Sequence, residues 1–321
     1  MRLSRRQFAA LAFAGPFLAT REGNGAEGWR SGPPMPTPRS ELTGAALGGR
    51  IYAAGGIAQL GITPALQAFD PARAEWQRLA SVPQGRHHGA MAALGGRLIL
   101  TGGFDNLPFG AEDAVGETWI YNPIRDAWAA GPPMPGRRAA HAVAVVADRL
   151  YVVGGIGDDP EKLYAFDPAA ASWEVLATSL PTLREHLTAA TVDGRIHAIA
   201  GRWNGGVNRT DHEIYDPAST SWARGADLPT ARSGLGAAVI RGRIHVLGGE
   251  DLLAGKVFWE HEVFDPAAGA WRSESPLPTA RHGLVVTMES ENLYIIGGGE
   301  AAGALTILNL SDKMEIWSPS P

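Results

Sequence analysis

Six arginines stand at matching positions along the chain. Each follows a proline by three residues and precedes a pair of small residues by sixteen. The six are Arg39, Arg86, Arg138, Arg184, Arg232 and Arg281. A guanidinium presents a planar fork of donors that suits a carboxylate or a phosphate, so a ring of these arginines would bind an anion. The alternative is that each arginine pairs with backbone carbonyls or a nearby acid, because a residue present in every repeat often serves the repeat itself.

Ionisable side chains that do not recur lie close to these arginines. His88 and His186 each follow a motif arginine by two residues, Glu185 follows one directly, and Glu250 comes directly after Gly249. A histidine near a glutamate can transfer a proton near neutral pH. Since the repeat does not require these residues, they are candidates for a ligand-binding or catalytic site. Solvated or hydrogen-bonded rim residues are the alternative.

Three aromatic residues also fall outside the repeated pattern, namely Phe109, Trp203 and Trp259. An aromatic plate beside polar groups suits the face of a sugar. We therefore expect Trp203 to stack on a ligand whose anionic group is held by Arg184, Arg232 and Arg281. The alternative is a loop anchored by its own side chains.

The elements that must position these residues repeat with a period of about fifty residues. After the arginine and the small pair, each of the first five copies has an Asp-Pro or Asn-Pro turn and a tryptophan six residues beyond the turn's first residue. Four short strands fit each period. In the fifth copy we expect them at 235–240, 243–247 and 262–264 and around Trp271. Six such copies predict an all-β fold, a six-bladed β-propeller with the arginines and variable loops on one rim.

The sixth copy and the N-terminal region compete for one strand. In the sixth copy Ser311 takes the place of the turn residue, and Trp317 keeps the tryptophan spacing. Trp29 precedes Arg39 by ten residues, as Trp76 precedes Arg86. We expect Trp29 to lie on the outer strand of the sixth blade, which would remove an exposed edge, with Trp317 as the competing choice.

Taken together, these landmarks resemble the Kelch repeat, and the resemblance covers residues 29–317. It implies a Kelch-type propeller, in a family that includes protein-binding modules, sugar enzymes and copper oxidases. In Kelch modules that bind acidic peptides, arginines at this motif position contact the ligand. The copper-radical oxidases need a cysteine crosslinked to a tyrosine, and this chain has no cysteine, so that activity is not expected.

The first residues resemble a twin-arginine export signal. Arg5 and Arg6 precede an apolar run over residues 9–19 that is too short to span a bilayer. We expect a signal peptide at 1–26 and the propeller at 27–321, exported to the periplasm or secreted, with no membrane insertion after signal removal. A chance arginine pair before a core strand is the alternative. Export without cysteine is consistent with a ring of sheets large enough to fold without disulfides.

Composition limits the partners. A net charge of −5 argues against a nucleic-acid partner. The glycine pairs end strands and begin no helix, so no nucleotide fingerprint is present. His197 and His245 replace tyrosines at equivalent second-strand positions, and the other histidines show no metal-ligand spacing. We therefore expect no metal and no cofactor, and a monomer.

Three functions remain open on this basis. The first is a non-catalytic binding module for an anionic, carbohydrate or protein ligand on the arginine-lined rim. The second is a carbohydrate mutarotase or epimerase, because exported bacterial Kelch propellers that resemble this chain act as sialic acid mutarotases, with Glu250, Glu185 and His186 as the acid–base candidates. The third is a protein-interaction scaffold that uses a broad apolar patch across Leu107, Phe109, Leu252, Leu253 and Phe258.

Overall fold

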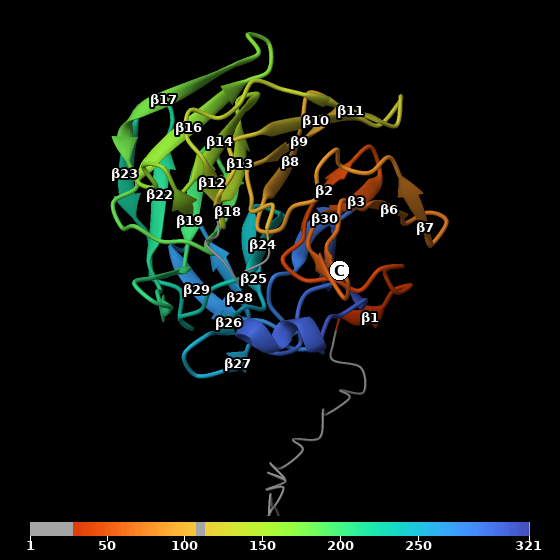
Figure 1. Ribbon diagram of the computed structural model, residues 1–321. Helices are drawn as coiled ribbons and strands as arrows, with labels where there is room; N and C mark the ends of the chain where they lie inside the picture. Colours follow the sequence, from red (N-terminus) through yellow and green to blue (C-terminus); the bar gives the residue numbers. More distant parts are fainter. Residues whose placement is uncertain (1–27, 107–112, 321) are drawn as a thin grey trace, which may run out of the picture.

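The computed structural model describes residues 28–106 and 113–320. The predicted signal peptide at 1–26 and Phe109 lie outside the described residues, and export therefore stays a prediction. Six antiparallel four-stranded sheets follow one another in sequence order (Figure 1), which confirms the six-bladed β-propeller. Each innermost strand contacts the innermost strand of the next blade, and β30 contacts β2, so the ring is closed.

The blades are numbered 1 to 6 by their innermost strands, in chain order. These innermost strands are β2 (Thr43–Leu47), β8 (Ala90–Leu94), β13 (Ala142–Val146), β18 (Thr188–Val192), β24 (Gly236–Ile240) and β30 (Val285–Glu289). The second strands are β3 (Arg50–Ala54), β9 (Arg97–Thr101), β14 (Arg149–Val153), β19 (Arg195–Ile199), β25 (Arg243–Leu247) and β31 (Asn292–Ile296). The third strands are β6 (Leu66–Asp70), β10 (Thr118–Asn122), β16 (Lys162–Asp167), β22 (His212–Asp216), β28 (His261–Asp265) and β32 (Met314–Trp317). The outer strands are β7 (Glu75–Leu79), β11 (Ala127–Ala130), β17 (Ser172–Ser179), β23 (Ser221–Arg224), β29 (Ala270–Ser273) and β1 (Trp29–Ser31).

The sixth blade takes strands from both ends of the chain. β1 pairs antiparallel with β32, and Trp29 lies opposite Trp317. The prediction that Trp29 occupies the outer strand is confirmed. The interpretation of Ser311 and Trp317 as the turn and outer-strand tryptophan is wrong, because Trp317 lies on the third strand, where blade 1 carries Phe69. With β1 in the outer position, β32 needs no turn to a following strand.

Except for Trp222 in blade 4, whose indole N–H has no hydrogen-bond partner among the described residues, the outer-strand tryptophans tie each blade to the one before it. The indole N–H of Trp29 donates to the carbonyl of Ser275 at 3.1 Å, just after the outer strand of blade 5. In the same way Trp76 donates to Pro33 at 3.0 Å and Trp271 to Ala226 at 2.7 Å. Apolar clusters between neighbouring sheets complete the core. The repeated tryptophan thus has an inter-blade role, which explains its constant spacing.

The loops that leave the second strands form one rim of the ring, here called the loop rim. It carries short hairpins formed by β4 (Ile57–Ala58) with β5 (Gly61–Ile62), by β20 (Arg202–Trp203) with β21 (Val207–Asn208), and by β26 (Glu250–Asp251) with β27 (Lys256–Val257). It also carries β12 (Arg138–Ala139) paired with β15 (Ile156–Gly157), and the 3-10 helix η1 (Gly303–Leu308). Among the residues that the structure describes, no helix is long and apolar enough to cross a membrane.

Candidate functional site

The six motif arginines are buried, each at most 2% exposed. Their guanidinium groups donate within their own blades. Arg39 donates to the carbonyls of Ala53 and Ala65 at 3.0 and 3.1 Å, and Arg184 donates to Glu213 at 2.5 Å. In the same way, Arg232 pairs with Glu262 and Arg281 with Glu315, both on the third strand of the blade. Arg86 pairs with Glu117. Arg138 donates instead to backbone carbonyls of the loop that follows the second strand. The arrangement is that of the structural alternative, and ligand contact by these arginines stays a prediction.

The residues two positions after these arginines form a belt around the central channel. The belt consists of Glu41, His88, Ala140, His186, Gly234 and Gly283, and all six have a positive φ between 49° and 64°. Backbone N–H groups link them from blade to blade: His88 donates to Glu41 at 3.1 Å, and His186 donates to Ala140 at 2.9 Å. A left-handed backbone at a residue other than glycine costs about 1–3 kcal/mol and is often found at functional sites.

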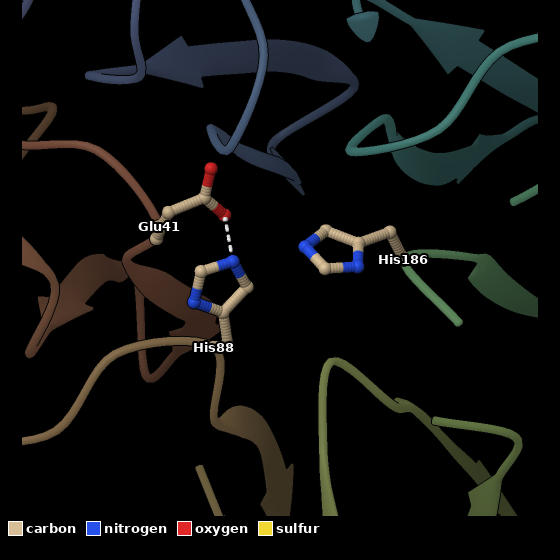
Figure 2. Close-up of side chains that lie close together, drawn as sticks. All are labelled: Glu41, His88 and His186. Carbon is tan, nitrogen blue, oxygen red and sulfur yellow. Dashed lines mark ion pairs between the residues drawn. The ribbon is translucent and has the colours of Figure 1, made fainter. Parts of the chain in front are cut away.

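Three side chains of the belt converge at the mouth of the channel (Figure 2). Glu41 Oε2 lies 3.1 Å from His88 Nε2, and the His88 and His186 rings meet edge to face with centroids 4.7 Å apart. Candidate ligand atoms of the three residues all lie within 4.8 Å of one another. His282 approaches from blade 6, with its Nδ1 3.2 Å from Glu41 Oε1. Side chains from four blades therefore meet on the axis.

Arg202 joins the predicted acidic residues to this group. It lies on β20 directly after the Ala200-Gly201 pair, where a bridge to Glu185 places it beside the belt. Its Nε donates to Glu185 Oε1 at 2.9 Å and its Nη1 to Glu250 Oε1 at 2.5 Å. His186 Nε2 lies 3.1 Å from Arg202 Nη2, and His186 Nδ1 contacts Glu185 Oε2. The structure thus brings together four of the predicted site residues: His88, His186, Glu185 and Glu250.

Burial and charge set the protonation of this cluster. Burial alone would raise the pKa of Glu41, but His88 and a hydrogen bond with His282 hold that pKa well below its usual value. Burial lowers the pKa of His88 to about 4, and burial and Arg202 hold the pKa of His186 well below its usual value. Burial opposes the effect of Glu41 on His282, yet the hydrogen bond and charge of Glu41 raise the pKa of His282. At neutral pH the site therefore holds an ionised carboxylate beside two neutral imidazoles.

A cavity of about 230 Å³, here called the mouth cavity, opens over the belt on the loop rim. Its polar floor consists of Ser40, Glu41, His88, His186, Arg202, Glu250 and His282. Its apolar walls include Ile57, Phe104, Leu252 and Ile307, and Thr306 and Ala304 of η1 cover one side. A second space of about 100 Å³ is lined by the belt and by the leucines that directly precede innermost strands, including Leu42 and Leu187. The belt separates the two.

Several predicted residues lie elsewhere. Trp203 is half-buried on β20 and is not among the residues that line the mouth cavity. Trp259 is 56% exposed, also away from the cavity. Phe258 is buried, with Lys256 Nζ 4.2 Å from its ring centroid. Leu107 and Phe109 lie outside the described residues, so the described part of the predicted apolar patch reduces to Leu252 and Leu253.

Glu41, Arg202 and His282 also belong to the site, although they were not among the predicted site residues. A signal was present, because Glu41, His88 and His186 all occupy the position two residues after a motif arginine. The expectation that the histidines lack metal-ligand grouping also considered only their spacing along the chain. It did not consider that equivalent positions of different blades meet at the axis.

The ring of six sheets with a polar site on its axis defines the class of protein as a six-bladed β-propeller. The KLHDC2/KLHL20/DRC7 Kelch-repeats domain matches residues 24–155 and 129–298. The chain belongs to the Kelch-repeat family.

Individual relatives match part of the chain. Kelch-like protein 35 of Mus musculus is 32% identical over 203 residues, which make up 62% of this chain and 33% of that protein. Kelch-like protein terF of Aspergillus terreus is 27% identical over 218 residues, 62% of this chain and 47% of that protein. The chain thus spans a third to about half of these relatives. The solved structure of YjhT has a TM-score of 0.76 at 18% identity and covers 89% of this chain and 97% of that one, which shows a common fold.

Proposed function

We propose that this protein is a binding module that takes a small carbohydrate in the mouth cavity. The Kelch propeller fold supports a binding role in general. The observation that carries the proposal is the pairing of a polar floor, rich in acceptors and imidazoles, with apolar walls at Phe104 and Leu252. A sugar has the matching surface, with hydroxyl groups at its edge and C–H groups on its faces.

Charge favours a neutral sugar over an anion. Of the described residues that line the mouth cavity, Arg202 is the one arginine, and its donors are already held by Glu185 and Glu250. Glu41 and Glu250 add two carboxylates to the floor. A carboxylate ligand would meet repulsion there, whereas hydroxyl groups can donate to these oxygens and accept from the imidazoles. The size of the cavity, below the about 300–1,000 Å³ of drug-sized ligand sites, suits a monosaccharide.

A cavity-filling variant tests this proposal. Ala304 is exposed at the wall of the cavity, and Leu305 beside it on η1 is 62% exposed outside the cavity. The full chain is screened by thermal shift and calorimetry against neutral hexoses, pentoses and the matching uronic acids. We expect a neutral sugar to raise the Tm by mass action, Ala304→Phe to abolish the rise, and the control Leu305→Phe to retain it. Absence of any sugar-dependent shift, or a shift that survives Ala304→Phe, would overturn the proposal.

The acid–base groups on the floor favour mutarotation as a second candidate. Opening a sugar ring needs a base for the anomeric hydroxyl proton and an acid for the ring oxygen. Ionised Glu41, whose pKa lies well below its usual value, can act as the base, and neutral His88, with its pKa lowered to about 4, lies 3.1 Å from it. Anomer exchange of the bound sugar, followed by NMR, should accelerate with the protein and return to the buffer rate in His88→Gln. An unchanged exchange rate with the wild-type protein would refute catalysis and leave binding intact.

A further inference from the structure

We propose that Glu41, His88 and His186 bind a divalent transition-metal ion of the zinc type at the centre of the belt. These residues also line the mouth cavity, but the inference does not rest on the carbohydrate proposal, because metal binding can be measured without any sugar. One carboxylate and two imidazoles, each from a different blade, present their ligand atoms within 4.8 Å of one another (Figure 2). Imidazole and carboxylate are ligands of zinc, whereas calcium and magnesium prefer oxygen alone.

The spacing of these atoms is close to what an ion needs. Ligands at about 2.0–2.2 Å from a tetrahedral ion lie roughly 3.4 Å apart. Glu41 Oε2 and His88 Nε2 are already 3.1 Å apart. His186 Nε2 lies 3.1 Å from Arg202 Nη2, so an ion at this nitrogen would have to replace that contact. The belt fixes all three backbones by hydrogen bonds, so the ligands are preorganised from the three blades.

Each imidazole has a partner for its other nitrogen. His186 Nδ1 contacts Glu185 Oε2, and Glu185 is in turn held by Arg202. His88 Nδ1 contacts His87 Nδ1, whose Nε2 lies 2.7 Å from the carbonyl of Asn106. A metal-bound histidine almost always has such an outer partner, which fixes the tautomer and leaves the opposite nitrogen free for the ion. For His186 this outer partner is a carboxylate, and for His88 it is a second imidazole.

The charge of the cluster also suits a cation. Glu41, Glu185 and Glu250 face one guanidinium, that of Arg202, among the described residues of the cluster. A divalent ion would offset the remaining negative charge, which His282 offsets only when protonated. With three protein ligands the ion keeps an open coordination position. Because all three ligands line the mouth cavity, a hydroxyl group of a bound molecule could complete the coordination.

Metal titration of the full chain tests the site without any sugar. The protein is treated with EDTA, dialysed, and titrated with Zn²⁺ by calorimetry and with Co²⁺ by visible absorption, with Mg²⁺ in parallel. We expect one equivalent of Zn²⁺, a Co²⁺ spectrum of four- or five-coordinate type, and no Mg²⁺ binding. Glu185→Gln should weaken Zn²⁺ binding by about 10–100-fold, as loss of an outer partner does.

Two double variants locate the ion. His88→Gln with His186→Gln should abolish Co²⁺ absorption. The matched control, His197→Tyr with His212→Leu, removes two histidines from the interior of blade 4 and should bind as the wild type does. If circular dichroism shows that the first variant is misfolded, Glu41→Gln is used for the same test. Zero stoichiometry, equal binding of Mg²⁺, or Zn²⁺ binding that survives loss of the belt ligands would overturn the inference, whatever the outcome of the sugar screen.

Discussion

Two buried histidine pairs should make this propeller sensitive to acid. In blade 4, His197 Nδ1 lies 2.8 Å from His212 Nε2, and His212 Nδ1 lies 3.0 Å from the Ala226 carbonyl. His245 and His261 repeat this arrangement in blade 5. Blades 1, 3 and 6 carry a tyrosine with leucine or methionine at the equivalent positions, for example Tyr151 with Leu163 in blade 3. The double variant His197→Tyr with His212→Leu therefore replaces the histidine pair of blade 4 with the tyrosine and leucine found in blade 3.

The magnitude follows from the pKa values. Burial lowers the pKa of His197 to about 3 and that of His212 to about 4, against about 6.5 in an unfolded chain. Below pH 6.5 the unfolded state thus binds more protons than the folded state. The stability that the neutral histidine pair contributes is fully present above pH 6.5 and is lost as the pH falls towards 4. Each histidine therefore lowers the free energy of unfolding at pH 4.5 by about 2.5 kcal/mol relative to pH 7.5, and the pair lowers it by roughly 5 kcal/mol. Total stability is of the order of 5–15 kcal/mol, so the effect is large.

Urea unfolding at pH 7.5 and pH 4.5, followed by circular dichroism, measures this difference. We expect the wild type to lose about 3–5 kcal/mol more than the double variant between the two pH values. Carboxylates titrate in both proteins, so their effect cancels. The reverse change in blade 3, Tyr151→His with Leu163→His, should increase the loss. Equal losses in the wild type and the blade 4 variant would refute the conclusion that these histidines are neutral when folded.

Two further predictions concern the belt and the motif arginines. A Cβ at Gly283 would lie 2.4 Å from Glu41 Oε1, so Gly283→Ala should displace Glu41 and weaken Zn²⁺ binding about tenfold or more. The control is Gly269→Ala, at a glycine with a similar φ of 62° and open space around it. In the same titration this control should leave the Zn²⁺ affinity unchanged. Glu213→Ala leaves buried Arg184 without its carboxylate and should lower the free energy of unfolding in urea by about 3–5 kcal/mol. The control, Asp227→Ala, removes an exposed ion pair and should lower it by at most about 1 kcal/mol. Similar losses in both variants would contradict the structural role of the arginines.

The repeat pattern predicted the fold well because each blade is local in sequence. The expected strand at 243–247 matches β25 (Arg243–Leu247), and the place of Trp29 was found by spacing alone. Trp317 was misplaced because spacing does not distinguish a third strand from an outer one when the turn signal is missing. Pairing along the sheet, with Trp29 opposite Trp317, decides the matter.

The site was predicted less completely for a physical reason. His88, His186, Glu185 and Glu250 were selected because the repeat did not need them, and they do meet. Their meeting point depends on the left-handed backbone of the belt, which turns side chains of separate blades towards the axis. For the arginines, spacing along the chain showed that the six positions are equivalent. It did not show that their side chains are buried against strand carbonyls and carboxylates.

The pairing of β1 with β32 bears on how the ring folds. Blades 1 to 5 each form from one continuous stretch of chain, whereas blade 6 joins residues near both ends, Trp29 and Trp317. A contact of such long sequence separation has a high loop-closure entropy and forms slowly. The first five blades can assemble during synthesis, but ring closure must wait for the last strand to be made. Until then β1 and the free edge of β31 have no partner, and an unpaired edge of this kind invites pairing with other chains.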